Sequence, residues 1–135
     1  ISKIASGGEL ARIMLVMKDV LSERDGTPAM VFDEIDEGVS GVAAQRVAEK
    51  LARLSKKKQV ICVTHLPQIA AMADTHFRIE KTERDGRTYT KVTPLEREGR
   101  IRELARLHGG ANITDTTLAS AAEQLDAASE YKGGI

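Results

Sequence analysis

Acidic side chains gather directly after a short apolar run near residue 30. Asp33 and Glu34 follow the run 29–32, and Asp36 and Glu37 come close behind. Carboxylates beside an apolar strand are costly unless a cation or hydrogen bonds compensate for their lost hydration. One carboxylate can hold Mg²⁺, directly or through water, while its neighbour orients or deprotonates a water molecule. A solvated turn after a strand is the more common source of such a pattern, and it stays open for the acids taken alone.

Two further features could meet a phosphate group. Ser6, Gly7, Gly8 and Glu9 stand just ahead of a predicted helix, where paired glycines let backbone N–H groups approach an anion closely. The same S-x-x-E spacing is that of a helix capping box, and the two roles do not exclude each other. His65 follows a second apolar run and can hydrogen-bond a phosphate oxygen, although a lone histidine at a strand end is more often structural.

The elements around these residues place them at one edge of a sheet. Apolar periodicity predicts helices over 10–21 and 42–54, and the runs 29–32 and 60–63 predict strands buried on both faces. Strand, helix, strand in this order predicts a parallel pair. Because the carboxyl ends of parallel strands bind ligands in open α/β sheets, the acids and His65 should share one rim. That combination describes nucleotide phosphate hydrolysis.

The second half of the chain predicts a hairpin and more helices around this α/β core. These elements are a short helix from 66 to about 73, strands over 76–82 and 87–93 flanking Asp85-Gly86, and helices over 98–108 and 115–129. Gly109-Gly110 should end the first of the long helices, Thr114 should cap the second, and residues 131–135 should fray. We therefore predict one α/β domain over 1–135.

Composition excludes several classes of protein. The 135 residues are 41% hydrophobic and 30% charged, with 20 basic against 20 acidic side chains, so neither a membrane protein nor a strongly cationic nucleic-acid module is indicated. Aromatic residues make up only 3%, which argues against a base-stacking platform. The single Cys62 lies in an apolar run and should be an inert thiol in a reducing compartment. No G-x-x-x-x-G-K-[ST] phosphate loop occurs, so this chain cannot build a complete ATP site alone.

Three motifs in order resemble those of ABC-type ATPases, in their SMC-like and Rad-fifty-like version. The signature motif is matched by residues 3–10 (KIASGGEL), the Walker B strand by 30–34 (MVFDE) and the histidine switch by 63–65 (VTH). Residues 33–41 (DEIDEGVSG) and 64–68 (THLPQ) are most similar to a bacterial branch that repairs DNA double-strand breaks. The resemblance implies the C-terminal lobe of an ATPase head that acts in repair and recombination.

The resemblance also implies a role for each matching residue of the signature and of Walker B. Ser6, Gly7, Gly8 and Glu9 would bind the γ-phosphate of ATP held by an opposing head, and Glu9 stands where many members have glutamine. Asp33 would hold Mg²⁺ beside the ATP bound by its own head.

The remaining implied roles are catalytic or concern the dimer. Glu34 would polarise the attacking water, and His65 would sense the γ-phosphate. Asp36 would take the dimer-contact role that many ABC proteins give to an aspartate at the position of Ser40. The implied partners are an N-terminal Walker A lobe of the same protein, a second head in a homodimer, and DNA bound through the full-length protein in the bacterial cytoplasm. We expect this fragment by itself to be inactive.

Three alternatives remain at this point. The chain could be a dimerising or DNA-clamping module without catalysis, although Asp33, Glu34 and His65 are intact. It could be a self-contained metal-dependent phosphohydrolase that uses those residues and Asp36. It could also be the nucleotide domain of a transporter, but there the segment after Walker B is usually rich in Pro, Thr and Ser.

Overall fold

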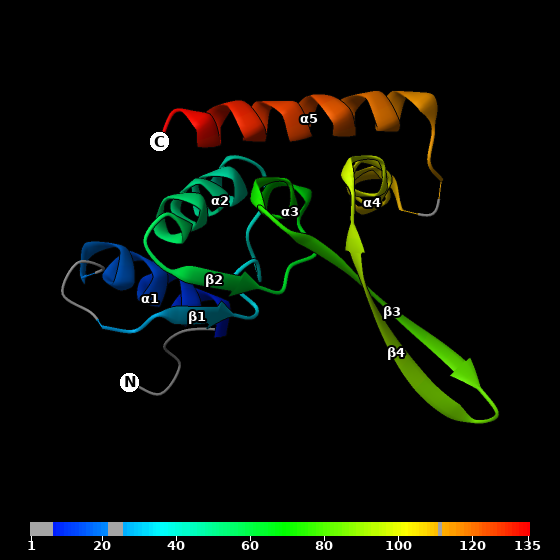
Figure 1. The fold of residues 1–135 in the computed structure, drawn as a ribbon, viewed down its shortest axis with the longest axis horizontal. Coiled ribbons are helices and arrows are strands. Elements are labelled where there is room, and N and C mark those ends of the chain that lie inside the picture. The colour runs from blue at the N-terminus through cyan, green and yellow to red at the C-terminus, as the bar shows by residue number, and fades with distance from the viewer. Residues whose placement is uncertain (1–6, 22–25, 111) are drawn as a thin grey trace.

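The structure is a computed structural model that describes residues 7–21, 26–110 and 112–135. Its elements follow one another in the order that Figure 1 shows. They are α1 (Gly7–Leu21), β1 (Ala29–Phe32), α2 (Gly41–Ser55), β2 (Gln59–Cys62), α3 (Pro67–Met72), β3 (His76–Arg84), β4 (Arg87–Leu95), α4 (Arg97–Gly109) and α5 (Asp115–Gly133). The predicted α/β class, with a βαβ core, a hairpin and two closing helices, is confirmed.

Strands β1 and β2 form a parallel pair, as predicted, with α2 as the crossover between them. Phe32 pairs with Cys62 and Val31 with Ile61. The prediction that both faces are buried is wrong for the described residues: Phe32 is 4% exposed, but Val31 is 69% and Ile61 49% exposed. Successive side chains of a strand point to opposite faces, and only the face of Phe32 packs on the hydrophobic core. A continuous apolar run therefore leaves one apolar face of this pair exposed.

The hydrophobic core lies among α2, α3, α4 and α5, which stack on one side of the parallel pair (Figure 1). Helix α2 buries one face, which consists of Ala44, Ala48, Leu51, Ala52 and Leu54. Leu104 of α4 and Leu125 of α5 belong to the same buried cluster. Full burial of one such leucine contributes about 1.5–3 kcal/mol. This layer fixes the parallel pair, whose strand ends carry the candidate site.

Helix α1 is less buried than its sequence predicts. Of its side chains that the structure describes, only Leu15 is buried, at 2% exposure. Met14 and Met17, which the periodicity assigns to the core, are 45% and 51% exposed, whereas Met72 of α3 is buried as expected. The wide apolar stripe of α1 thus faces solvent over most of its width.

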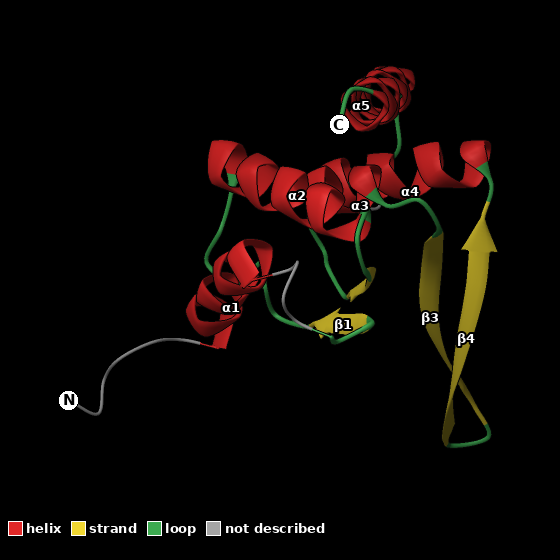
Figure 2. Ribbon diagram, turned by 60° about the vertical axis from the view of Figure 1, so that its left-hand side comes forward, coloured by secondary structure: helices red, strands yellow, loops and turns green. Residues whose placement is uncertain are grey.

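The hairpin β3–β4 forms around the predicted turn and is longer than expected. Asp85 and Gly86 both have positive φ, 52° and 69°, which is the geometry of a two-residue turn that matches strand twist. The strands pair antiparallel from His76 opposite Leu95 to the turn. Figure 2 shows the hairpin reaching away from the helical layer.

The C-terminal helix has the predicted start but not the predicted end. The Thr114 hydroxyl accepts from the backbone N–H of Thr117, and the Thr117 hydroxyl accepts in return from the N–H of Thr114, so the cap is confirmed. Fraying from residue 131 is wrong, because α5 continues to Gly133. There the Tyr131 hydroxyl accepts from Arg53 Nε at 3.0 Å, and Lys132 donates to Asp74 at 2.8 Å. None of the described helices is long and apolar enough to span a bilayer.

Candidate nucleotide phosphate site

The carboxyl ends of β1 and β2 bring the predicted acids and the predicted histidine together. The segments that leave the two strands border a hollow of about 340 Å³. It is lined by Asp33, Glu34, Asp36, Glu37, Val63, Thr64 and His65. Residues about 30 positions apart in the chain thus share one rim, as the parallel pairing predicts. Carboxylates and an imidazole at one rim can bind a cation, orient water and contact an anion.

Asp36 is the buried centre of this rim. Its side chain is 4% exposed, and its Oδ2 accepts from the Thr64 hydroxyl at 2.5 Å and from the backbone N–H of His65 at 2.8 Å. Burial by itself would raise the pKa of Asp36, but these donors and the nearby imidazole of His65 outweigh it and hold the pKa below 3.8. The ionised carboxylate therefore fastens the loop after β1 to the segment after β2.

His65 is held by one ring nitrogen and otherwise exposed. Its Nδ1 lies 3.0 Å from Asp36 Oδ2, while 74% of the side chain is accessible to solvent. Since an ionised carboxylate only accepts, Nδ1 must carry a proton in this contact. The ring is thus oriented from the protein side and presents most of its surface outward.

Asp33 and Glu34 are exposed at the same rim, and Glu34 has an unusual backbone. Its φ is 57°, in the left-handed region that costs a residue with a side chain about 1–2 kcal/mol. The Glu34 N–H donates to Asp33 Oδ1 at 3.0 Å, and the Glu34 carbonyl accepts from the N–H of Glu37. Strained conformations of this kind persist where the surroundings fix them, often at functional sites.

The carboxylates of the rim suit a magnesium ion, which keeps water and phosphate ligands, better than a metal that is bound by protein side chains alone. No group of three His, Cys, Asp or Glu side chains is arranged as a metal cage among the residues that the structure describes. Mg²⁺ keeps several waters and is usually bound by one or two carboxylates together with phosphate oxygens. Asp33, exposed at the strand end, can supply one such carboxylate beside a nucleotide.

The signature residues are described only in part. Ser6 lies outside the described residues, whereas Gly7 and Gly8 form the start of α1 and Glu9 is exposed in its first turn. The helix begins three residues earlier than the periodicity predicts, because glycines give no apolar signal. The first N–H groups of a helix have no partner within it, so this end can receive an anion.

Arg12 is a residue of the site that sequence reasoning missed. Its Nη1 donates to the backbone carbonyl of Glu37 at 2.7 Å and to that of Ile35 at 3.2 Å. Helix α1 is thereby tied to the loop that carries Glu34. The available signal was that Arg12 is the one charged residue within the apolar stretch 10–17.

Two side chains outside the rim, Cys62 and Lys58, are partly or fully buried. Burial, followed by the charges of Asp36 and Asp33, raises the pKa of the Cys62 thiol to about 12, which supports the prediction of an unreactive thiol. Lys58 is 7% exposed, and its ammonium donates to the carbonyl of Thr27 at 2.8 Å, so it is a structural residue in this chain.

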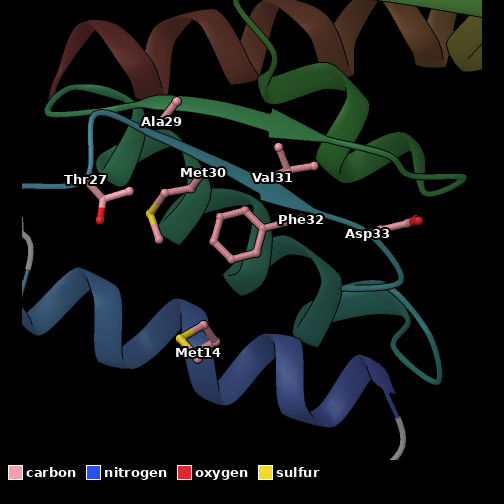
Figure 3. Close-up of a pocket in the computed structure, with 7 residues that line it drawn as sticks. All are labelled: Met14, Thr27, Ala29, Met30, Val31, Phe32 and Asp33. Atoms are coloured by element: carbon pink, nitrogen blue, oxygen red, sulfur yellow. The ribbon is translucent and has the colours of Figure 1, made fainter.

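A second hollow, of about 250 Å³, lies between α1 and β1. Figure 3 shows its lining, in which Met14, Met30 and Phe32 outnumber the polar groups of Thr27 and Asp33. An apolar hollow of this kind does not suit a phosphate, so the candidate site stays at the rim beyond the strand ends.

The chain is similar to bacterial DNA repair proteins over almost its whole length. The DNA repair protein RecN of Bacillus subtilis (strain 168) is 48% identical over 132 residues, which cover 98% of this chain and 23% of the relative. This chain is a homologue of RecN. The RecN proteins of Haemophilus influenzae and Treponema pallidum are 47% and 45% identical, over 93% and 99% of the chain. The chain spans about a quarter of the length of these RecN relatives.

The fold is also found among solved structures. A structure described as "Structural biochemistry of ATP-driven dimerization and DNA stimulated activation of SMC ATPases" matches with a TM-score of 0.57 and 29% identity. The match covers 80% of this chain and 65% of that chain. The search with protein-family profiles gave no match. The predicted resemblance to SMC-type ATPases and to a bacterial branch of DNA repair proteins is confirmed by these likenesses.

Proposed function

We propose that this chain is the C-terminal lobe of an ABC/SMC-type ATPase head in a RecN-type protein that acts in DNA double-strand-break repair and recombination. It would supply the signature motif, the Walker B acids and the switch histidine to ATP sites formed between two heads. The observation that carries this proposal is the shared rim of Asp33, Glu34 and His65 in a chain homologous to RecN.

In this function the two exposed acids have different tasks. Asp33 would hold Mg²⁺ together with the phosphates of ATP, and the metal would offset their negative charge. Glu34 orients the attacking water and accepts its proton. The exposure of both side chains at the same rim supports this division, because each carboxylate is accessible to a ligand.

His65 and Asp36 act as a pair in the proposed site. His65 contacts the γ-phosphate with the exposed part of its ring, while the protonated Nδ1 stays on Asp36. We expected Asp36 itself to contact the nucleotide or the opposing head. Its 4% exposure and its bonds to Thr64 and His65 favour a different role, in which it positions His65 from below.

The signature end of α1 serves the opposing head. Ser6, Gly7, Gly8 and Glu9 would lie against the γ-phosphate of ATP bound there, with backbone N–H groups as donors. The start of α1 at Gly7 supports this, since it leaves the glycine N–H groups in the unpaired first turn.

A separate Walker A lobe of the same protein would cover the apolar surfaces that this chain exposes. Ile13, Met17 and Val20 of α1 and Val31 and Ile61 of the parallel pair are each about half exposed or more. Large apolar side chains exposed in this number on two elements are what an uncovered interface would show. This chain spans 23% of its RecN relative, which leaves ample length for such a lobe and for contacts to DNA, while the second head of the dimer would come from another copy of the protein.

The proposal is tested by ATP hydrolysis of the full-length protein with Glu34→Gln. We expect ATP binding to persist, kcat to fall by about 10²–10⁴-fold, and ATP-closed head dimers to accumulate. Glu83→Gln, which removes the same charge near the hairpin tip, is the matched control and should behave as wild type. Normal hydrolysis by the Glu34 variant would contradict the assignment. Mg²⁺-dependent hydrolysis by this chain alone would instead favour a self-contained phosphohydrolase.

A further inference from the structure

Arg12 connects the helix that carries the signature to the loop that carries Glu34. One terminal nitrogen of its guanidinium, Nη1, donates to the carbonyls of Ile35 and Glu37, 23 and 25 positions away in the chain. Resting on the proposed function, we propose that Arg12 is a positioning residue for Glu34: it sets the carboxylate against the ATP bound by its own head by holding this loop on α1.

The loop needs such a restraint because its conformation is costly. Two consecutive turns follow β1, closed by the N–H of Glu37 on the carbonyl of Glu34 and the N–H of Val39 on the carbonyl of Asp36. Glu34 and Gly38 both have positive φ, 57° and 68°. Glycine adopts that region freely, but glutamate does not. The strain at Glu34 is therefore maintained by contacts elsewhere in the loop.

Those contacts come from two opposite directions. The carboxylate of Asp36 is fixed to Thr64 and His65 at the end of β2. The carbonyls on either side of Asp36 belong to Ile35 and Glu37, and both accept from Arg12. Removal of the guanidinium leaves the loop held by Asp36 and by the buried side chain of Ile35, but frees the carbonyls of Ile35 and Glu37, so that Glu34 can relax out of the left-handed region.

The position of Arg12 on α1 determines which of the two ATP sites its loss should affect. Of the described side chains of α1 only Leu15 is buried, so Arg12 supplies a polar anchor where packing is sparse. In the proposed dimer the signature of a head faces the ATP of the opposing head, whereas Glu34 faces the ATP of its own head. Loss of Arg12 should therefore slow hydrolysis only at the site of the head that carries the change.

The first test measures full-length protein with Arg12→Gln, Arg12→Lys and the control Arg46→Gln. Arg46 is a 76% exposed arginine of α2 whose partner, Glu49, lies three residues away. A displacement of a catalytic group by about 1 Å can cost 10²-fold in rate, so we expect kcat of Arg12→Gln to fall about 10- to 100-fold. KM and the ATP Kd should stay within about twofold, and Arg12→Lys should recover part of the rate because its ammonium still donates. A rise in KM or Kd that matches the loss of kcat would overturn the proposal.

The second test uses mixed dimers in which one head carries Glu34→Gln, so that a single site hydrolyses ATP. With Arg12→Gln in the head that keeps Glu34, the rate should fall as in the first test. With Arg12→Gln in the other head, the rate should remain near that of the unmodified mixed dimer. Equal losses in the two arrangements, or no loss in either, would overturn the positioning role. If Glu34→Gln homodimers hydrolyse ATP normally, the proposed function itself is wrong, and the two failures are thereby distinguished.

Discussion

Replacement of Asp36 by asparagine should destabilise the fold far more than a typical Asp→Asn change. The carboxylate is buried and accepts from Thr64 Oγ and the N–H of His65, at 2.5 and 2.8 Å. A hydrogen bond to a charged group contributes about 1.5–3 kcal/mol, and a buried donor left unpaired costs about 1–3 kcal/mol. Both donors meet the same oxygen, Oδ2, so an asparagine oxygen in that place can still accept from them, but the two bonds are no longer made to a charged group. Because a bond to a neutral group contributes about 1 kcal/mol less than one to a charged group, we expect a loss of about 2–3 kcal/mol. Asp36→Ala leaves both donors unpaired and should lose about 3–5 kcal/mol.

Urea unfolding of the 135-residue chain, followed by circular dichroism at neutral pH, measures these losses. The matched control is Asp126→Asn, because Asp126 pairs with Arg97 at 2.7 Å on the surface, with 59% of its side chain exposed. Exposed pairs contribute only about 0–1 kcal/mol. The pKa of Asp36 lies below 3.8, so its contribution is complete above that pH and is lost as the pH falls through the folded-state pKa. A loss for Asp36→Asn no greater than that of Asp126→Asn would refute the reasoning.

Two further predictions concern His76 and Cys62, whose pKa values are also shifted. Burial and the charge of Arg100 lower the pKa of His76 below its ordinary value, and the charge of Glu103 opposes them more weakly. As the pH falls, His76 is therefore protonated in the unfolded chain before it is protonated in the folded chain. The free energy of unfolding should therefore decrease between about pH 7.5 and pH 5, and His76→Gln should lose that part of the slope in a urea series. Cys62, with its pKa near 12, should react with a thiol reagent about 10³-fold more slowly in the folded chain than in urea at pH 8; equal rates would contradict its burial.

The order of elements could be predicted because each has a strong local signal. Asp85-Gly86 specifies its turn by allowing positive φ at both positions, and Thr114 specifies the start of α5 through its hydroxyl. The end of α5 could not be predicted in this way. It is held by Tyr131 and Lys132 through contacts to Arg53 and Asp74, which lie far away in the sequence.

Burial of the apolar segments was predicted less well, for a physical reason. The run 29–32 is continuously apolar and the apolar stripe of α1 is wide, which predicts a covering layer on more than one side of each. The described residues cover the face of Phe32 but leave Val31 and Val20 69% and 76% exposed. Hydrophobicity specifies that a surface should be buried, not which segment buries it. This mismatch is what a lobe that needs a second lobe would show.

The candidate site shows the same limit at the level of single side chains. Parallel pairing was enough to predict that the acids after β1 and His65 after β2 share a rim. It could not separate four acids of the same chemical type within five positions, because their difference is one of environment. Asp36 is 4% exposed and bound by three groups of the neighbouring segment, whereas Asp33 and Glu34 are exposed. In the proposed function, a carboxylate so fully occupied is a poor ligand, so the chemistry would fall to the two exposed acids, and the buried one would keep the loop and His65 in place.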